Sequence, residues 1–394
     1  MRTFAHAFTL GRRAVLLSAL AASTLLTGCS GSVQPDPAPK PLTQIQSSYT
    51  LDKIWARGIG SLGNAQYPIA PALDMGTLYA ADARGRLQAI QADNGDVRWT
   101  RELNVPVSSG ISTSAGQLFM GTRKGEVLAV DANTGDIVWR AKVASEVLSA
   151  PQANSGSVIV QSVDGTLTAL DRLTGQTQWL YAASQPVLTL RGTNTPRTID
   201  PITFAGFANG RLALFDNNDG HMLWDMRLAV PKGGSEIDQL TDISGQPLLT
   251  DDGRLFATSY NGRVVSLNVR SGEMLWSQDI SSYRSPVYAN DTLYVIDARS
   301  HVHALDATTG TIKWSQDQLE GRELTSPVVI NDQLALGDLD GYVHLLDTQD
   351  GHIDGRQKAG GDGTNITPLS DGQHLFVMTN SGRVYAYTLS PRKP

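Results

Sequence analysis

The stretch Gly125-Glu126-Val127-Leu128-Ala129-Val130-Asp131, followed by Thr134-Gly135 and Trp139, recurs as Gly165-Thr166-Leu167-Thr168-Ala169-Leu170-Asp171, followed by Thr174-Gly175 and Trp179. The first glycines of these two copies are 40 residues apart. Six further copies of the pattern give anchors at Gly85, Gly125, Gly165, Gly210, Gly262, Ser300, Gly341 and Gly382. Periods near this length, with four short strands in each, are typical of propeller blades. The sequence therefore predicts an all-β protein, an eight-bladed β-propeller of four-stranded antiparallel blades.

The segment after each anchor is apolar at positions that point to opposite faces of a strand, as at Val127 and Val130. A strand that is apolar on both faces is expected between two neighbouring sheets. A small residue lies between these positions in most copies, which favours close approach of adjacent blades. The carboxylates Asp131, Asp171, Asp216, Asp306 and Asp347 then open a turn in which an Asx side chain accepts backbone N–H groups. Because they recur around the ring, we interpret these aspartates as structural.

Six of the seven tryptophans close the first six blades: Trp99, Trp139, Trp179, Trp224, Trp276 and Trp314. The seventh copy has Gly355 at this position, and the eighth ends before reaching a tryptophan. Trp55 remains near the start of the chain. Because a propeller protects its strand edges by closing its ring, we expect an amino-terminal strand from Lys53 to Arg57 to complete the last blade as its outer strand.

The first 28 residues have the order of an export signal. Arg2, Arg12 and Arg13 precede an apolar run over residues 14–26, which is too short for a permanent membrane span. The residues before Cys29 complete a Leu-Thr-Gly-Cys sequence that resembles the bacterial lipobox, and Cys29 is the one cysteine of the chain. We expect cleavage after residue 28, lipid attachment at Cys29 and, because Ser30 follows instead of Asp, delivery to the periplasmic face of the outer membrane.

Residues 29–48 are rich in proline, serine and glutamine, which favours an extended, flexible tether before a propeller at 49–394. Removing the three signal arginines changes the formal net charge from −6 to −9. A mildly acidic body argues against binding of nucleic acid or of an anionic membrane face. With no second cysteine, we expect blade packing, and no disulfide, to stabilise the exported domain.

The chain carries no motif for catalysis, a metal or a phosphate. The repeats resemble those of the quinoprotein dehydrogenases, which wrap eight such blades around a quinone and calcium, but this chain lacks the adjacent cysteine pair that those enzymes place against the cofactor. His301 and His303 alternate on one strand and share a face, the minimum for a two-histidine metal site, yet no third ligand is evident. We therefore expect no catalytic residue, no metal and no cofactor, and favour an interblade packing role for these histidines.

Two intervals between blades are enlarged, from Trp179 to Gly210 and from Trp224 to Gly262. Both lie between the outer strand of one blade and the inner strand of the next, so they bracket a single blade on the same face. In the first, Leu188 and Leu190 beside Arg191 offer apolar anchors and a strong donor, a mixture favoured at interfaces. The alternative is that the two leucines begin an inner strand.

The lipobox, the proline-rich segment, the tryptophan-marked blades, the Leu-x-Leu-Arg-Gly loop and a Ser-Glu-Ile-Asp-x-Leu-x-Asp loop together resemble the BamB family of outer-membrane protein assembly factors along the whole chain. The resemblance implies a non-catalytic lipoprotein of the β-barrel assembly machinery that binds POTRA domains of BamA. It also implies interaction residues at Leu188, Leu190, Arg191 and Asp242, while a second family aspartate is Ser244 here. A periplasmic quinoprotein-like enzyme and a general carrier of unfolded, nascent β-barrel clients are the alternative functions.

Overall fold

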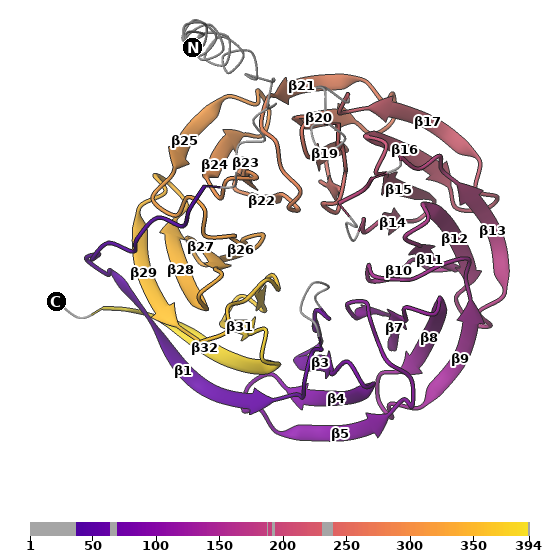
Figure 1. Cartoon of the computed structure of the whole chain (residues 1–394), viewed down its shortest axis with the longest axis horizontal. Helices are drawn as coiled ribbons and strands as arrows, with labels where there is room; N and C mark the ends of the chain where they lie inside the picture. Colours follow the sequence, from indigo (N-terminus) through magenta and orange to yellow (C-terminus); the bar gives the residue numbers. More distant parts are fainter. Residues whose placement is uncertain (1–36, 64–68, 187, 191–193, 231–238, 393–394) are drawn as a thin grey trace, which may run out of the picture. The chain divides into compact units, whose positions relative to one another are not determined.

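The computed structural model describes residues 37–63, 69–186, 188–190, 194–230 and 239–392. These residues form 32 β-strands in eight four-stranded antiparallel sheets, and the sheets follow one another around a ring (Figure 1). The predicted eight-bladed β-propeller is thus confirmed. None of these residues belongs to a helix of the length and apolarity needed to cross a bilayer.

Each blade runs from an inner to an outer strand. Blades one to four comprise β2 (Ala72–Asp74), β3 (Thr77–Ala81), β4 (Arg86–Gln91), β5 (Val97–Glu102); β6 (Ser112–Ser114), β7 (Gln117–Gly121), β8 (Glu126–Asp131), β9 (Ile137–Lys142); β10 (Gln152–Ala153), β11 (Ser157–Gln161), β12 (Thr166–Asp171), β13 (Thr177–Ala182); and β14 (Arg197–Ile199), β15 (Ile202–Gly206), β16 (Arg211–Asp216), β17 (Met222–Arg227). Blades five to eight comprise β18 (Leu248–Leu249), β19 (Arg254–Thr258), β20 (Val264–Asn268), β21 (Met274–Gln278); β22 (Val287–Ala289), β23 (Thr292–Ile296), β24 (Val302–Asp306), β25 (Ile312–Gln316); β26 (Val328–Ile330), β27 (Gln333–Gly337), β28 (Tyr342–Asp347), β29 (Ile353–Lys358); and β30 (Leu369–Ser370), β31 (His374–Met378), β32 (Arg383–Pro391) with β1 (Tyr49–Gly58).

The first and last strands of the propeller meet in blade eight. Strand β1 pairs antiparallel with β32, and the sheet order is β1-β32-β31-β30, so β1 is the outer strand of the last blade. The predicted closure over Lys53 to Arg57 is confirmed, and the pairing extends beyond it, from Tyr49 to Gly58.

At six of the eight seams, a tryptophan of one blade packs against the next blade. Trp55 Nε1 donates to the carbonyl oxygen of Ala92 at 2.8 Å, and a Cβ added to Gly95 would lie 2.7 Å from the indole ring. The same arrangement recurs for the pairs Trp99 and Gly135, Trp139 and Gly175, Trp179 and Gly220, Trp276 and Gly310, and Trp314 and Gly351. The Asx turn of one blade is therefore the surface against which the tryptophan of the preceding blade packs.

The seam between blades four and five departs from this pattern. Trp224 Nε1 has no hydrogen-bond partner among the described residues, and a Cβ on Gly272 would lie 3.3 Å from its ring. Across strands β16 and β17, Trp224 lies opposite Leu214, whereas Trp99, Trp139 and Trp179 lie opposite alanines. The bulkier pair coincides with a cleft of about 490 Å³ between the two blades, lined by residues that include Arg197, Leu249 and Asn268.

Residues 37–48 contact blades six and seven. Lys40 N–H donates to the carbonyl oxygen of Glu320 at 2.9 Å, and Arg356 donates to that of Thr43 at 2.8 Å. Leu42 and Ile45 are partly buried against the apolar cluster between these blades. The expected flexible tether therefore does not extend over this part of 29–48, because two apolar side chains within a polar segment suffice to dock it; residues 29–36 lie outside the described residues.

A buried polar cluster lies in blade seven. Asp338 Oδ2 accepts hydrogen bonds from Arg322 Nε at 2.8 Å and from His344 Nε2 at 2.9 Å. Arg356 Nε donates to His344 Nδ1 at 3.1 Å, so Nδ1 is the acceptor and the proton lies on Nε2. Burial lowers the pKa of His344, and the neighbouring Asp338 only partly offsets this effect. His344 is thus a neutral link between a carboxylate and a guanidinium.

Candidate functional site: the connections that flank blade four

The two enlarged connections precede blades four and five. They join β13 to β14 and β17 to β18, over residues 183–196 and 228–247. Strand β12 pairs with β13 so that Thr166 lies opposite Ala182, which puts both connections at the same end of the blades as the β11–β12 turn. Blade four is therefore flanked on one face of the ring by both connections, as the sequence predicts.

The first connection presents an exposed leucine. Leu188 is 41% exposed, and Leu190, two residues further on, is half-buried. Neither residue lies in a strand, since β14 begins at Arg197, so the alternative in which these leucines start an inner strand is wrong. Arg191 lies outside the described residues, and so does Cys29.

Asp242, by contrast, is buried, with 1% of its surface exposed. Its Oδ1 accepts a hydrogen bond from Asn194 Nδ2 at 2.8 Å, and Asn194 also donates to the carbonyl oxygen of Ile243 at 2.8 Å. Burial raises the pKa of Asp242, against the opposing effect of hydrogen bonds from Asn194, Ser244 and the backbone of Ile243 and Leu190. In this structure Asp242 faces inward and links the two connections, and it does not offer a carboxylate at the surface.

The second connection is also fixed by its backbone. Tyr260 N–H donates to the carbonyl oxygen of Asp242 at 2.8 Å, and Thr241 forms a parallel bridge with Asn209. Asn209 in turn donates through Nδ2 to the carbonyl oxygen of Ser184 in the first connection. The two connections and the β15–β16 turn thus form one hydrogen-bonded unit, which sequence spacing alone does not show because Asn194 and Asp242 are 48 residues apart.

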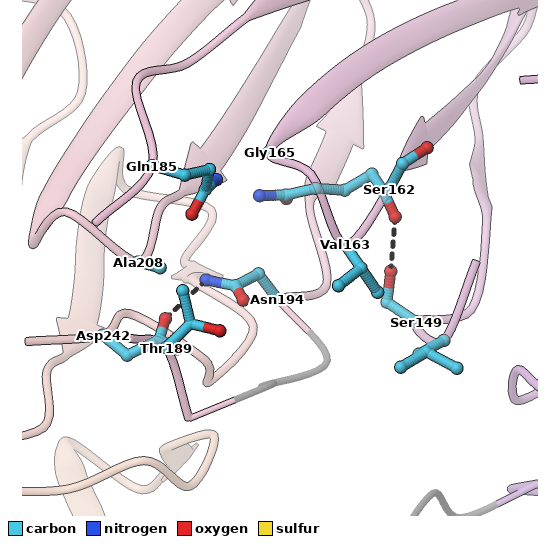
Figure 2. A pocket seen from close by; sticks show the side chains of 11 residues that line it. Ser149, Ser162, Val163, Gly165, Gln185, Thr189, Asn194, Ala208 and Asp242 are labelled. Carbon is cyan, nitrogen blue, oxygen red and sulfur yellow. Dashed lines mark hydrogen bonds between the residues drawn. The ribbon is translucent and has the colours of Figure 1, made fainter. Parts of the chain in front are cut away.

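A small polar cavity lies beneath this unit. Its volume is about 20 Å³, room for a single water molecule. Figure 2 shows Asn194 directed at Asp242, with Gln185 and Thr189 among the other lining side chains. A cavity of this size holds no organic ligand.

Ser244 is half-buried and lines the axial cavity of the ring. This cavity measures about 210 Å³, and Arg284 is the charged residue among the described residues that line it. Small side chains such as Gly110, Ala150 and Gly245 make up much of its wall.

Comparisons with known proteins place this chain in a family. The family model described as outer membrane protein assembly factor BamB matches residues 83–316. The chain is 43% identical to the outer membrane protein assembly factor BamB of Pseudomonas aeruginosa, over 94% of this chain and 97% of the relative. It is 32% identical to the protein of the same description from Escherichia coli, over 95% of this chain and 99% of the relative.

Solved structures give the same result. The crystal structure of BamB from Moraxella catarrhalis matches with a TM-score of 0.78 at 27% identity and covers 86% of this chain and all of that chain. Quinohemoprotein alcohol dehydrogenase from Comamonas testosteroni matches with a TM-score of 0.68 at 14% identity, over 88% of this chain and 77% of that one. At that identity, the second match shows a shared fold alone.

Proposed function

Because this chain belongs to the BamB family of outer-membrane protein assembly factors, we propose that it is a non-catalytic scaffold of the β-barrel assembly machinery. In this role it binds the periplasmic POTRA domains of BamA beside other subunits of the complex and aids the folding and insertion of outer-membrane β-barrels. The proposal includes a lipid anchor at Cys29 that holds the propeller at the periplasmic face of the outer membrane.

The observation that carries the partner site is the exposed Leu188 on a connection whose underside is fixed. The Asn194–Asp242 hydrogen bond and the Asn209–Ser184 hydrogen bond hold the two connections together. A preorganised apolar anchor loses little conformational entropy on binding, and such anchors dominate interface energies. Leu188 would fill an apolar recess of the partner, while Arg191 would donate to a carboxylate or carbonyl at the rim.

In this proposal Asp242 positions the loop and does not itself contact the partner. A carboxylate that is 1% exposed reaches no partner without unfolding its surroundings. Its contribution to binding is therefore to hold Asn194 and the loop that carries Leu188 and Leu190.

The test is a binding titration of the purified full-length chain in detergent against the periplasmic region of BamA. Leu188→Ala is expected to weaken binding by about 30-fold, the loss typical of a central anchor of about 2 kcal/mol. Leu173→Ala is the matched control, because Leu173 is 67% exposed and lies in the β12–β13 turn on the opposite face of the ring. Equal affinities for the two variants would place the interface elsewhere.

The two alternatives have separate signatures. A quinoprotein-like enzyme would carry the absorbance of a bound quinone when purified from its own host. A general carrier of unfolded clients would bind denatured β-barrel proteins with the same affinity in the Leu188→Ala variant as in the wild type. Loss of BamA binding in that variant, with client binding unchanged, would separate the scaffold function from the carrier function.

A further inference from the structure

A histidine-rich cluster lies in blade six, at the turn between β23 and β24. Asp297 Oδ2 is 2.9 Å from His301 Nδ1 and 3.3 Å from His303 Nε2. One ligand atom from each of these three residues lies within 4.8 Å of the other two. The side chains are 14–20% exposed, so the cluster is lined by protein yet open to solvent on one side.

The remaining polar atoms of the three residues are already engaged. Asp297 Oδ1 accepts the backbone N–H groups of Arg299 at 2.9 Å and of His301 at 2.7 Å. His303 Nδ1 is 2.8 Å from Ser315 Oγ, and His301 Nε2 is 3.4 Å from Glu320 Oε1. Acceptors of this kind on the outer nitrogen fix the tautomer and orientation of metal-binding histidines. When the outer nitrogens carry the protons, two imidazole lone pairs and a carboxylate oxygen converge, an arrangement that a bound cation would satisfy.

Blade seven provides an internal comparison. Asp338 and His344 occupy the same repeat positions as Asp297 and His303. In both blades the backbone N–H of the aspartate donates to the carbonyl oxygen of the residue four positions later, and the histidine follows the aspartate by six positions. There the cation is Arg322, whose Nη2 is 2.7 Å from Asp338 Oδ2. The backbone bond from Leu339 N–H to the Arg322 carbonyl oxygen has its counterpart in the bond from Ala298 N–H to the Ser281 carbonyl oxygen.

Ser281 therefore occupies, beside blade six, the position that Arg322 occupies beside blade seven. His301 stands at the position of Tyr342. The ion pairs described for Asp297 are both with histidines, whereas Asp338 pairs with a histidine and an arginine. In blade seven the cation beside the aspartate is the guanidinium of Arg322, whereas in blade six a second histidine, His301, lies beside the aspartate.

We propose that Asp297, His301 and His303 form a binding site for a divalent transition-metal ion of the zinc type, with its fourth position open to solvent. In a tetrahedral site with bonds of about 2.0–2.1 Å, ligand atoms are about 3.3 Å apart. The distance of 3.3 Å from Asp297 Oδ2 to His303 Nε2 matches this separation, and the distance of 2.9 Å to His301 Nδ1 would lengthen on metal binding. Two imidazoles and one carboxylate suit zinc, whereas calcium and magnesium prefer all-oxygen sites.

Glu320 links this site to the segment that precedes the propeller. Its carboxylate faces His301 Nε2 on one side, and its Oε2 is 3.1 Å from Lys40 Nζ. Arg299 also pairs with Glu320. Glu320 therefore acts as an outer acceptor for His301 while it holds Lys40, which places the metal site beside the docking contacts of residues 37–48.

The test is a titration of ZnCl2 into the full-length chain in detergent after removal of metal with EDTA, followed by calorimetry. Binding of one zinc per chain is expected, and His303→Gln is expected to weaken it at least tenfold. His374→Gln is the matched control, because His374 pairs with Asp371 at 2.9 Å in blade eight without a second histidine. Its zinc affinity should equal that of the wild type.

A second readout does not depend on affinity alone. Cobalt(II) bound in a four-coordinate site gives intense visible absorption, which should appear in the wild type and in His374→Gln and be lost in His303→Gln. Far-UV circular dichroism of the metal-free variants verifies that each is folded; if His303→Gln is not folded, Asp297→Asn, which keeps the Oδ1 acceptor, replaces it. Absence of saturable zinc binding, or equal affinity in the ligand variant and the control, would overturn the proposal.

Discussion

Trp55, on the first strand of the described chain, donates a hydrogen bond at 2.8 Å to the carbonyl oxygen of Ala92 in blade one. Trp55 belongs to the sheet of blade eight, so this bond spans the seam at which the ring closes. Its ring also covers Gly95 of the same turn. One residue thus secures the last blade to the first, in addition to the strand pairing within blade eight.

We expect Trp55→Phe to lower the free energy of unfolding by about 1 kcal/mol more than Trp224→Phe does. Trp55→Phe leaves the Ala92 carbonyl oxygen without its donor, and a net hydrogen bond contributes about 0.5–1.5 kcal/mol. Trp224 Nε1 has no partner among the described residues, so its replacement loses ring area alone. Urea unfolding of both variants measures the difference, and equal losses would show that the indole N–H does not contribute.

Gly95→Ala should destabilise the protein more than Gly76→Ala. Both glycines have positive φ, +77° and +69°, so both variants carry the backbone strain of about 1–2 kcal/mol. A Cβ at Gly95 would also lie 2.7 Å from the ring of Trp55, whereas one at Gly76 meets nothing within 4 Å. Overpacking of this kind costs about 1–3 kcal/mol. The thermal midpoints of the two variants give the comparison, and a larger loss for Gly76→Ala would contradict the packing account.

Asp242→Asn should retain binding to the periplasmic region of BamA, whereas Asp242→Ala should weaken it. An asparagine oxygen can still accept from Asn194 Nδ2, and the change removes a buried carboxylate whose pKa is raised by burial. Alanine leaves Asn194 without this acceptor and frees the loop that carries Leu188. If Asp242→Asn abolishes binding in a folded protein, the charge of Asp242 itself contacts the partner and the positioning role is wrong.

Stability should fall as the pH drops below about 6.5, and His344 should contribute to this fall. The folded-state pKa of His344 is lowered by burial, so the unfolded chain binds a proton below about pH 6.5 that the folded chain does not. Burial alone would raise the pKa of Asp338, but His344 and Arg322 lower it, so its contribution persists to lower pH and is lost as the pH falls through its folded-state pKa.

Urea unfolding between pH 7 and 5 measures this dependence. His344→Gln should reduce its slope by up to about 1.4 kcal/mol per pH unit, the value for one proton. If that variant does not fold, nuclear magnetic resonance of the wild type gives the same information. A His344 ring that titrates near pH 6.5 in the folded protein would contradict the prediction.

Most of the fold could be predicted from the sequence, because each blade repeats the same local rules. The glycine anchors, the apolar strands and the position of Trp55 sufficed for eight blades and for closure by the amino-terminal strand. The Asx turns form as expected, for example with Asp131 Oδ1 accepting from Asn133 and Thr134. Their packing against the tryptophan of the preceding blade was not predicted, since it joins residues of different repeats.

The site was predictable only in part. The enlarged connections and the exposed Leu188 follow from spacing and composition, but the inward position of Asp242 depends on Asn194, a partner that no local pattern indicates. The proximity of Asp297 to His301 and His303, on which the proposed metal site rests, was missed for a related reason. Asp297 occupies a repeat position at which other blades have turn-forming residues, and only the structure brings its Oδ2 to both rings.

The contacts of residues 37–48 with blades six and seven shorten the segment that can separate the propeller from the membrane. With an anchor at Cys29, as proposed, seven residues lie between the anchored cysteine and residue 37, which makes eight steps from one Cα atom to the next. At about 3.5 Å per residue, a fully extended chain of this length reaches about 28 Å. Blades six and seven would therefore stay within this reach of the bilayer, while the connections around blade four, which lies two blades from blade six in the ring of Figure 1, would remain available to a partner in the aqueous space.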